Sequence, residues 1–343
     1  MNAPGAQSGP LGSPAAREAP ELSIVVPVYN EADNIGPLLA RLKPVLERCA
    51  KSYEIIFVDD GSKDATLTRL RDAHEEDSRV IAVSFSRNFG KEIAISAGLD
   101  HAGGTGVVIM DADLQHPPEV IETFVAKWRE GYFNVYGVRA DRAGESFLRR
   151  KAAENFYSLF DAFGETALPA GAGDFRLLDR RAVDALRLMG ERARFSKGLY
   201  AWIGFRSIGV PFDVAERAHG VSKFSYRKLT RFALDGLMSF STLPLKVWIY
   251  VGTIVSVFAL AMAVFFILQT IRFGVDVPGY ASLIVSILFL SGIQLMSLGI
   301  LGEYVGRIFA EVKRRPLYIV GERIGLAHEY PRPPAIGDVR GQT

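Results

Sequence analysis

The sequence predicts an α/β domain with a mostly parallel sheet, followed by two transmembrane helices with flanking amphipathic juxtamembrane helices. Three observations support this prediction. In the first part of the chain, short apolar runs rich in β-branched residues alternate with helical patterns. Two uncharged apolar runs follow, over 247–271 and 281–301, and each exceeds the roughly 18 residues expected of a transmembrane candidate. Basic residues gather on one side of these two runs.

The apolar runs of the first part are interpreted as the strands of one sheet. Strands that alternate with helices of about 10–15 residues indicate βαβ units and parallel pairing. The runs are apolar almost throughout, as burial on both faces of a parallel sheet requires. The predicted strands are 22–29, 53–60, 79–86, 106–113 and 132–139, and the predicted helices are 33–48, 64–77, 90–102 and 117–130.

Acidic residues stand at the ends of three predicted strands, and an arginine stands at the end of a fourth. Open α/β sheets bind their ligands at the carboxyl ends of the strands. The first of these loops lacks the G-x-G-x-x-G pattern of dinucleotide-binding enzymes, and the chain has no G-x-x-x-x-G-K-[ST] loop. The residues at the strand ends are Tyr29, Asn30 and Glu31, then Asp59 and Asp60, then Asp111 and Asp113, and finally Arg139.

The stretch 107–119, VVIMDADLQHPPE, contains the pair of acids that most needs an explanation. In extended backbone, Asp111, Asp113 and Gln115 lie on one face and offer oxygen ligands to a hard cation such as Mg²⁺ or Mn²⁺. Two neighbouring carboxylates repel each other unless a cation lies between them. The alternative is a solvated turn whose Asp caps the helix that begins at 117. His116 is interpreted as a structural residue or as a contact behind the ligands.

Composition excludes some classes of function. A formal net charge of +2 gives no basic field that would attract nucleic acid. The one cysteine, Cys49, rules out an internal disulfide and is interpreted as a small buried residue. The predicted division is a disordered tail (1–20), the α/β domain (21–224), a juxtamembrane helix (225–245), two transmembrane helices (246–271 and 280–301), a second juxtamembrane helix (302–316) and a C-terminal tail (317–343).

Basic residues predict the orientation of the two spans. They precede the first span and follow the second, whereas the connector holds only Arg272. The positive-inside rule then places the α/β domain and both termini in the cytoplasm, at the inner (plasma) membrane. A buried helical hairpin of a soluble domain is the alternative. The flanking basic residues are Arg227, Lys228, Arg231, Lys246, Arg307, Lys313, Arg314 and Arg315.

The segments 225–243 and 303–315 each combine a basic face with an apolar one, which is typical of helices lying at a membrane surface. Ordinary capping helices are the alternative. Gly302 and Gly306 form a G-x-x-x-G step that permits close helix contact. With the behaviour of similar proteins, this step predicts a homo-oligomer.

Four motifs in order, followed by two spans, resemble a known family. IVVPVYNEADNI, IIFVDDGSKDAT, SFSRNFGKEIAISAGL and VIMDADLQHPPE are similar to family 2 glycosyltransferases, which have the GT-A fold, a Rossmann-like α/β domain. GDFRLLDRRAVDAL and HGVSKFSYRKL resemble the branch that acts on polyisoprenyl phosphates, similar to undecaprenyl-phosphate glucosyltransferases and dolichol-phosphate mannose synthases. The resemblance covers roughly residues 21 to 315.

The resemblance implies a role for each matching residue. Asp111, Asp113 and Gln115 would hold Mg²⁺ or Mn²⁺, and Asp113 would thereby serve catalysis. Asp174 stands where the family has its catalytic carboxylate, although an Asp near a turn also caps strands. Arg217 and Lys223 would face phosphates. The nucleotide-sugar pocket would be lined by Pro27, Tyr29, Glu31, Asp59 or Asp60, Asp111 and Arg139.

The implied function is a metal-dependent, inverting transfer of a hexose from a nucleotide sugar to a polyprenyl phosphate at the membrane. UDP-glucose and undecaprenyl phosphate are favoured, while GDP-mannose, galactose, aminoarabinose and N-acetylhexosamine donors stay open. An acceptor phosphate is largely ionised at pH 7, so Asp174 is expected to position the acceptor or take a residual proton. The rival functions are a processive polysaccharide synthase, which the QTIRF segment at 269–273 matches poorly, and a membrane-anchored scaffold.

Overall fold

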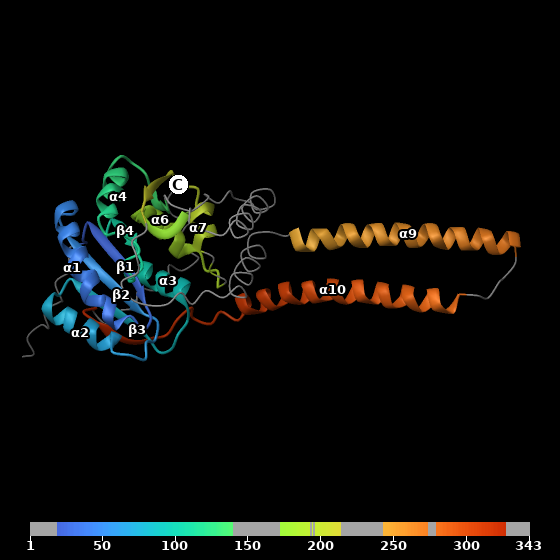
Figure 1. Cartoon of the computed structure of the whole chain (residues 1–343), viewed down its shortest axis with the longest axis horizontal. Coiled ribbons are helices and arrows are strands. Elements are labelled where there is room, and N and C mark those ends of the chain that lie inside the picture. The colour runs from blue at the N-terminus through green and yellow to red at the C-terminus, as the bar shows by residue number, and fades with distance from the viewer. Residues whose placement is uncertain are drawn as a thin grey trace, which may run out of the picture.

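The computed structural model describes residues 19–139, 172–192, 194, 196–213, 243–273 and 279–326. Figure 1 shows an α/β domain from which two long helices project side by side. In chain order, the elements are β1 (Leu22–Val28), α1 (Ala32–Cys49), β2 (Tyr53–Asp59), α2 (Thr66–Glu76), β3 (Val80–Phe85), α3 (Lys91–His101), β4 (Gly106–Ile109), α4 (Val120–Arg129), β5 (Asn134–Arg139), β6 (Ala172–Asp179), α6 (Arg180–Leu188), α7 (Ser196–Trp202), β7 (Ser207–Phe212), α9 (Leu243–Phe273), α10 (Tyr280–Val312) and β8 (Val320–Ile324).

The described strands form one eight-stranded sheet in the order β7-β5-β6-β4-β1-β2-β3-β8. The central strands β4, β1, β2 and β3 are parallel, as the alternation of strands and helices predicts. β6 lies between β4 and β5 and is antiparallel to both. The predicted fifth strand therefore does not pair with the fourth, because a strand that the alternation pattern does not reveal separates them.

Helices cover both faces of the sheet. One apolar core contains residues of α1, α2 and α4, and a second core contains residues of α3, α6 and α7. β1 contributes to both cores, since Ile24 and Val26 face the first and Val25 faces the second. Double-sided burial explains why the central strands are apolar almost throughout.

The predicted strand 106–113 ends early. β4 ends at Ile109, and residues 112–114 form a turn in which Leu114 has a φ of 59°. The expectation that Asp111, Asp113 and Gln115 share one face of an extended strand is therefore wrong. The chain turns back here because the backbone N–H of Asp111 donates to His116 Nδ1, which lies 3.2 Å away.

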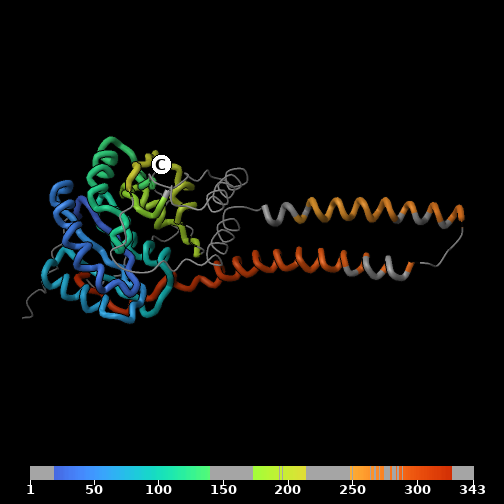
Figure 2. Tube along the Cα trace, viewed as in Figure 1, coloured from blue at the N-terminus to red at the C-terminus, as the bar shows by residue number. Residues whose placement is uncertain are grey.

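The C-terminal region also differs from its prediction as a tail. After α10 the chain returns to the domain, where Tyr318 stacks on Phe85 with ring centroids 5.0 Å apart. β8, which is red in Figure 2, then pairs antiparallel with β3 and forms one edge of the sheet. The predicted tail 317–343 thus contains a strand, although its residues beyond 326 lie outside the described part.

α9 and α10 contain the two predicted transmembrane runs. α10 continues without a break from the second run through the predicted juxtamembrane helix 302–316 as far as Val312. Within the described residues, one stretch, Phe289–Val312, is long and apolar enough to cross a membrane, and a shorter apolar stretch, Tyr250–Met262, lies in α9. Two spans therefore stay a prediction. The tail 1–18 and most of the juxtamembrane helix 225–245 lie outside the described residues.

Candidate active site

A cavity of about 370 Å³ opens at the carboxyl ends of β1, β2 and β4. This is the edge of the sheet where α/β domains bind ligands. Residues that follow four strands, β1 to β4, meet here because the parallel central strands end side by side. The cavity is lined by several residues that the sequence singles out, namely Pro27, Tyr29, Glu31, Asp60, Asp111 and Asp113.

Hydrogen bonds hold the two loops on one side of the cavity together. The backbone N–H of Asn30 donates to Ser62 Oγ at 2.8 Å, and Asn30 Oδ1 accepts from the backbone N–H of Lys63 at 2.8 Å. Asn30 has a φ of 55°, a left-handed conformation that Asn tolerates better than most residues. The reciprocal bonds offset this strain and give the cavity a fixed wall.

Asp59 and Asp60 have different surroundings. Asp59 is buried outside the cavity lining, and it accepts hydrogen bonds from Ser84 Oγ at 2.7 Å and from the backbone N–H of Ser62 at 2.9 Å. Asp60 lines the cavity and accepts from the backbone N–H groups of Phe89 and Gly90. Burial raises the pKa of Asp60, although these two hydrogen bonds oppose the rise. Of the two acids left open by the sequence, Asp60 is the one that can reach a ligand in this cavity.

His116 fixes the turn that carries the acid pair. Its ring is buried and stacks on Phe175 with centroids 4.8 Å apart. Burial lowers the pKa of His116, so the ring is neutral and its Nδ1 accepts the hydrogen bond from Asp111. The backbone N–H of Gln115 donates to Asp113 Oδ1 at 3.1 Å. His116 is therefore a support behind Asp111.

We expect His116→Phe to weaken this support without emptying the space beside Phe175. The variant keeps an aromatic ring for stacking but leaves the N–H of Asp111 without its acceptor, which costs about 1–3 kcal/mol of folding free energy. Chemical unfolding of the full chain in detergent measures the loss, and the KM for the donor should rise in parallel. A variant as stable as the wild type would show that the hydrogen bond contributes nothing.

Lys91 joins two of the predicted site carboxylates. Its Nζ lies 2.6 Å from Asp111 Oδ1 and 3.0 Å from Asp174 Oδ2. Burial alone would lower the pKa of Lys91, but the two carboxylates outweigh burial and raise the pKa. Burial would likewise raise the pKa of Asp174, but Lys91 and Lys197 hold it well below its usual range. Sequence reasoning gave Lys91 no role, although Lys91 lies in SFSRNFGKEIAISAGL, one of the four motifs that resemble the family.

Several buried polar side chains from β6, α3 and α7 lie near Asp174. Arg176 is fully buried, and its guanidinium carbon lies 3.6 Å from the centre of the Tyr200 ring. Ser196 donates a hydrogen bond to Glu92. Burial and the nearby Asp174 charge raise the pKa of Glu92. Asp174 is held by Lys91 of α3 through its Oδ2, while its Oδ1 has no hydrogen-bond partner among the described residues.

Comparisons with known proteins identify the family. A model of glycosyl transferase family 2 matches residues 23–187. A bactoprenol glucosyl transferase from Shigella phage SfII is 44% identical over 300 residues, covering 88% of this chain and 97% of the relative. This chain is a family 2 glycosyltransferase. An uncharacterized glycosyltransferase from Synechocystis sp. is 54% identical over 308 residues, covering 90% and 97% of the two chains. The structure of mannosyl-3-phosphoglycerate synthase from Rubrobacter xylanophilus matches with 20% identity and a TM-score of 0.44, covering 64% of this chain and 72% of that one.

The glycosyltransferase offers two carboxylates for a metal at this cavity. Asp111 and Asp113 both line it, whereas Gln115 does not. The described residues contain no cluster of three or more His, Cys, Asp or Glu side chains that would bind a metal alone. One or two carboxylates completed by substrate phosphates are typical of Mg²⁺ sites. Asp111 already pairs with one cation, the Lys91 ammonium, at 2.6 Å.

The predicted phosphate-binding residues are only partly placed. Arg139 ends β5 with an exposed side chain, and its charge contributes to lowering the pKa of His116. Arg217 and Lys223 lie outside the described residues.

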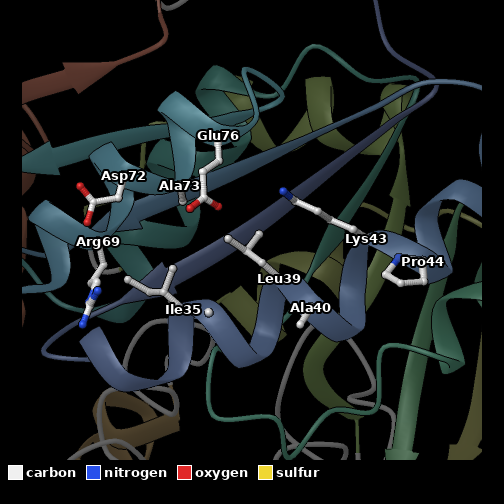
Figure 3. A pocket seen from close by; sticks show the side chains of 10 residues that line it. Ile35, Leu39, Ala40, Lys43, Pro44, Arg69, Asp72, Ala73 and Glu76 are labelled. Atoms are coloured by element: carbon white, nitrogen blue, oxygen red, sulfur yellow. The ribbon is translucent and has the colours of Figure 1, made fainter.

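A second cavity of the glycosyltransferase, of about 490 Å³, lies between α1 and α2. Figure 3 shows Ile35, Leu39, Lys43, Arg69 and Glu76 around it. None of the predicted site residues lines this second cavity.

Proposed function

We propose that this glycosyltransferase transfers glucose from UDP-glucose to a polyprenyl phosphate, favouring undecaprenyl phosphate, with inversion at the anomeric carbon. The observation that carries the proposal is the 44% identity to a protein named bactoprenol glucosyl transferase over 88% of this chain. The shared length extends well beyond the family domain at 23–187. GDP-mannose, aminoarabinose and N-acetylhexosamine donors are the alternatives that the experiment below separates.

We further propose that α9 and α10 both cross the membrane and present the active site to its cytoplasmic face. Large apolar side chains are widely exposed on both helices, with Phe258 at 67%, Phe289 at 65% and Leu295 at 69%. Exposed apolar surface of this extent is typical of a membrane or protein interface. Basic residues at the end of the hairpin nearest the domain, such as Lys313 and Arg314, support a cytoplasmic domain.

The residues at the cavity account for the proposed chemistry. Asp111 and Asp113 would hold a divalent cation, Mg²⁺ or Mn²⁺, with the donor diphosphate. When bound, this cation neutralises charge that develops on the leaving nucleotide diphosphate. Arg139, at the end of β5, would add a positive charge on the same side. The acceptor oxygen attacks the anomeric carbon from the face opposite to the leaving group, which gives inversion.

Asp174 supports a mechanism without a strong general base. The low pKa of Asp174 makes it a weak proton acceptor. The acceptor does not need a strong base, because a phosphate monoester has a second pKa of about 6 and is largely ionised at pH 7. Asp174 would therefore position the acceptor.

A panel of labelled nucleotide sugars tests the proposed function. The purified full chain is incubated with undecaprenyl phosphate and each donor, with Mn²⁺, with Mg²⁺ or with EDTA, and label is counted in the lipid extract. The proposal predicts lipid label from UDP-glucose only when a divalent cation is present. Label from GDP-mannose alone would favour the mannosyl alternative, and no label from any donor would favour a scaffold.

The pH dependence of transfer follows from the low pKa of Asp174. We expect the rate to fall as the pH drops below about 6, where the acceptor phosphate gains a proton. From pH 7 to 9 the rate should be flat, because Asp174 is already ionised and has no proton to lose. Initial rates at saturating donor measure this profile. A steep rise above pH 7 would require a general base with a higher pKa.

A further inference from the structure

Lys91 bridges two parts of the site that have different tasks in the proposed function. Asp111 would belong to the cation and donor side, and Asp174 would face the acceptor. In this structure one ammonium contacts both, at 2.6 Å and 3.0 Å. Lys91 is the first residue of α3, and hydrogen bonds from Phe89 and Gly90 to Asp60 fix the backbone before it. The Lys91 side chain lines the cavity and is 43% exposed, while its ammonium is held by the two carboxylates.

The bond between Lys91 and Asp111 conflicts with binding of a divalent cation. Asp111 Oδ1 already accepts the ammonium. Two cations on one carboxylate repel each other strongly in a partly buried site. Lys91 must therefore leave Asp111 when a divalent cation binds there. Asp174 is the other partner of Lys91 among the described residues.

The acceptor phosphate and Asp174 carry charges of the same sign and repel each other. Its ionised phosphate has to approach Asp174, which is itself held in the ionised form. Two anions need a cation between them. Among the described residues, Lys91 is the cation that forms an ion pair with Asp174, whereas Arg176 is buried against Tyr200.

We propose that Lys91 is a transferable cation that pairs Asp111 with Asp174 before the substrates bind, then moves to the acceptor phosphate when a divalent cation occupies Asp111. This inference rests on the proposed function. Lys91 thereby makes acceptor binding depend on a loaded donor side, since the ammonium becomes free for a phosphate only after Asp111 is taken. The ligand chemistry that it recognises is an ionised phosphate monoester on a lipid.

Lys91→Met in the full chain tests this proposal. Binding of Mn²⁺ alone, followed by electron paramagnetic resonance of the free ion, should be about 10-fold tighter because the competing ammonium is gone. The KM for undecaprenyl phosphate should rise by about 10-fold or more, while the KM for UDP-glucose should change by less than about 2-fold. Lys91→Arg should restore much of the lipid affinity, and it also serves if the Met variant does not fold.

Lys197→Met is the matched control, because Lys197 acts on the charge of Asp174 without bridging to Asp111. Tighter Mn²⁺ binding in the Lys91 variant but not in the Lys197 variant supports the proposal. Unchanged or weaker Mn²⁺ binding in Lys91→Met, or equal tightening in both variants, overturns it. A wild-type chain that binds no Mn²⁺ and labels no lipid overturns the proposed function as well. A wild-type chain that does both, with Lys91→Met unchanged, overturns only the role of Lys91.

Discussion

Asp113→Asn should lower the rate of sugar transfer by about 10²–10³-fold, comparable to removing one preorganised group that stabilises charge in a transition state. The substitution keeps the shape of the side chain and an oxygen that can accept from the N–H of Gln115. It removes the negative charge that would hold a divalent cation against the donor diphosphate. Excess Mn²⁺ should restore part of the rate, because the amide oxygen is a weaker ligand.

Glu119→Gln is the control for this variant. Glu119 lies six residues further along the chain, is exposed and pairs with Arg41 on the surface. Removing its charge should therefore have little effect on stability or on sugar transfer. Transfer rates at several Mn²⁺ concentrations are measured for both variants and the wild type. If Asp113→Asn retained wild-type activity in limiting Mn²⁺, Asp113 could not be a metal ligand.

Gly98→Ala should destabilise the α/β domain by about 1–3 kcal/mol, although Ala normally favours a helix. A Cβ at position 98 would overlap Cγ1 of Val25, so α3 and β1 must move apart or Val25 must change its conformation. Val25 is fully buried in the centre of the sheet and has little freedom to do so. The domain therefore requires glycine where α3 crosses β1.

A double-mutant cycle with Val25→Ala separates this contact from general damage. Val25→Ala removes the atom that the new methyl group meets, so the two substitutions together should cost less than the sum of their separate costs, by about 1 kcal/mol or more. Chemical unfolding of the four proteins in one detergent gives the coupling. Additive costs would show that Gly98 is required for another reason.

The sequence predicts the central part of the fold because the signal there is strong. Parallel strands buried on both faces give continuous apolar runs, and each run matches an observed strand to within a few residues. β6 and β8 were not predicted from the sequence. β6 reads AGDFRLLD, with Arg176 inside it, and this buried guanidinium is accommodated by its contact with Tyr200 and by hydrogen bonds to Gly173 and Asn134. β8 is a short strand, and it is stabilised by pairing with β3 far away in the chain.

The candidate site shows a similar division. Acids at strand ends predict which edge of the sheet binds a ligand, and Asp60, Asp111 and Asp113 do line one cavity there. Asp111 and Asp113 do not share one face of an extended strand, because the chain folds into a turn where the Asp111 N–H donates to His116 and the Gln115 N–H donates to Asp113. Lys91 could not be found from the sequence, since its importance depends on β6 bringing Asp174 next to Asp111.

The proposed mechanism depends most on Asp111 and Asp113 holding a divalent cation beside Asp174. A structure of the full chain with Mn²⁺ and UDP-glucose, with the anomalous signal of manganese used to place the ion, tests this directly. We predict one manganese peak between Asp111, Asp113 and the donor diphosphate, with Lys91 displaced from Asp111. Donor bound in the cavity with no manganese at these two carboxylates would contradict the account.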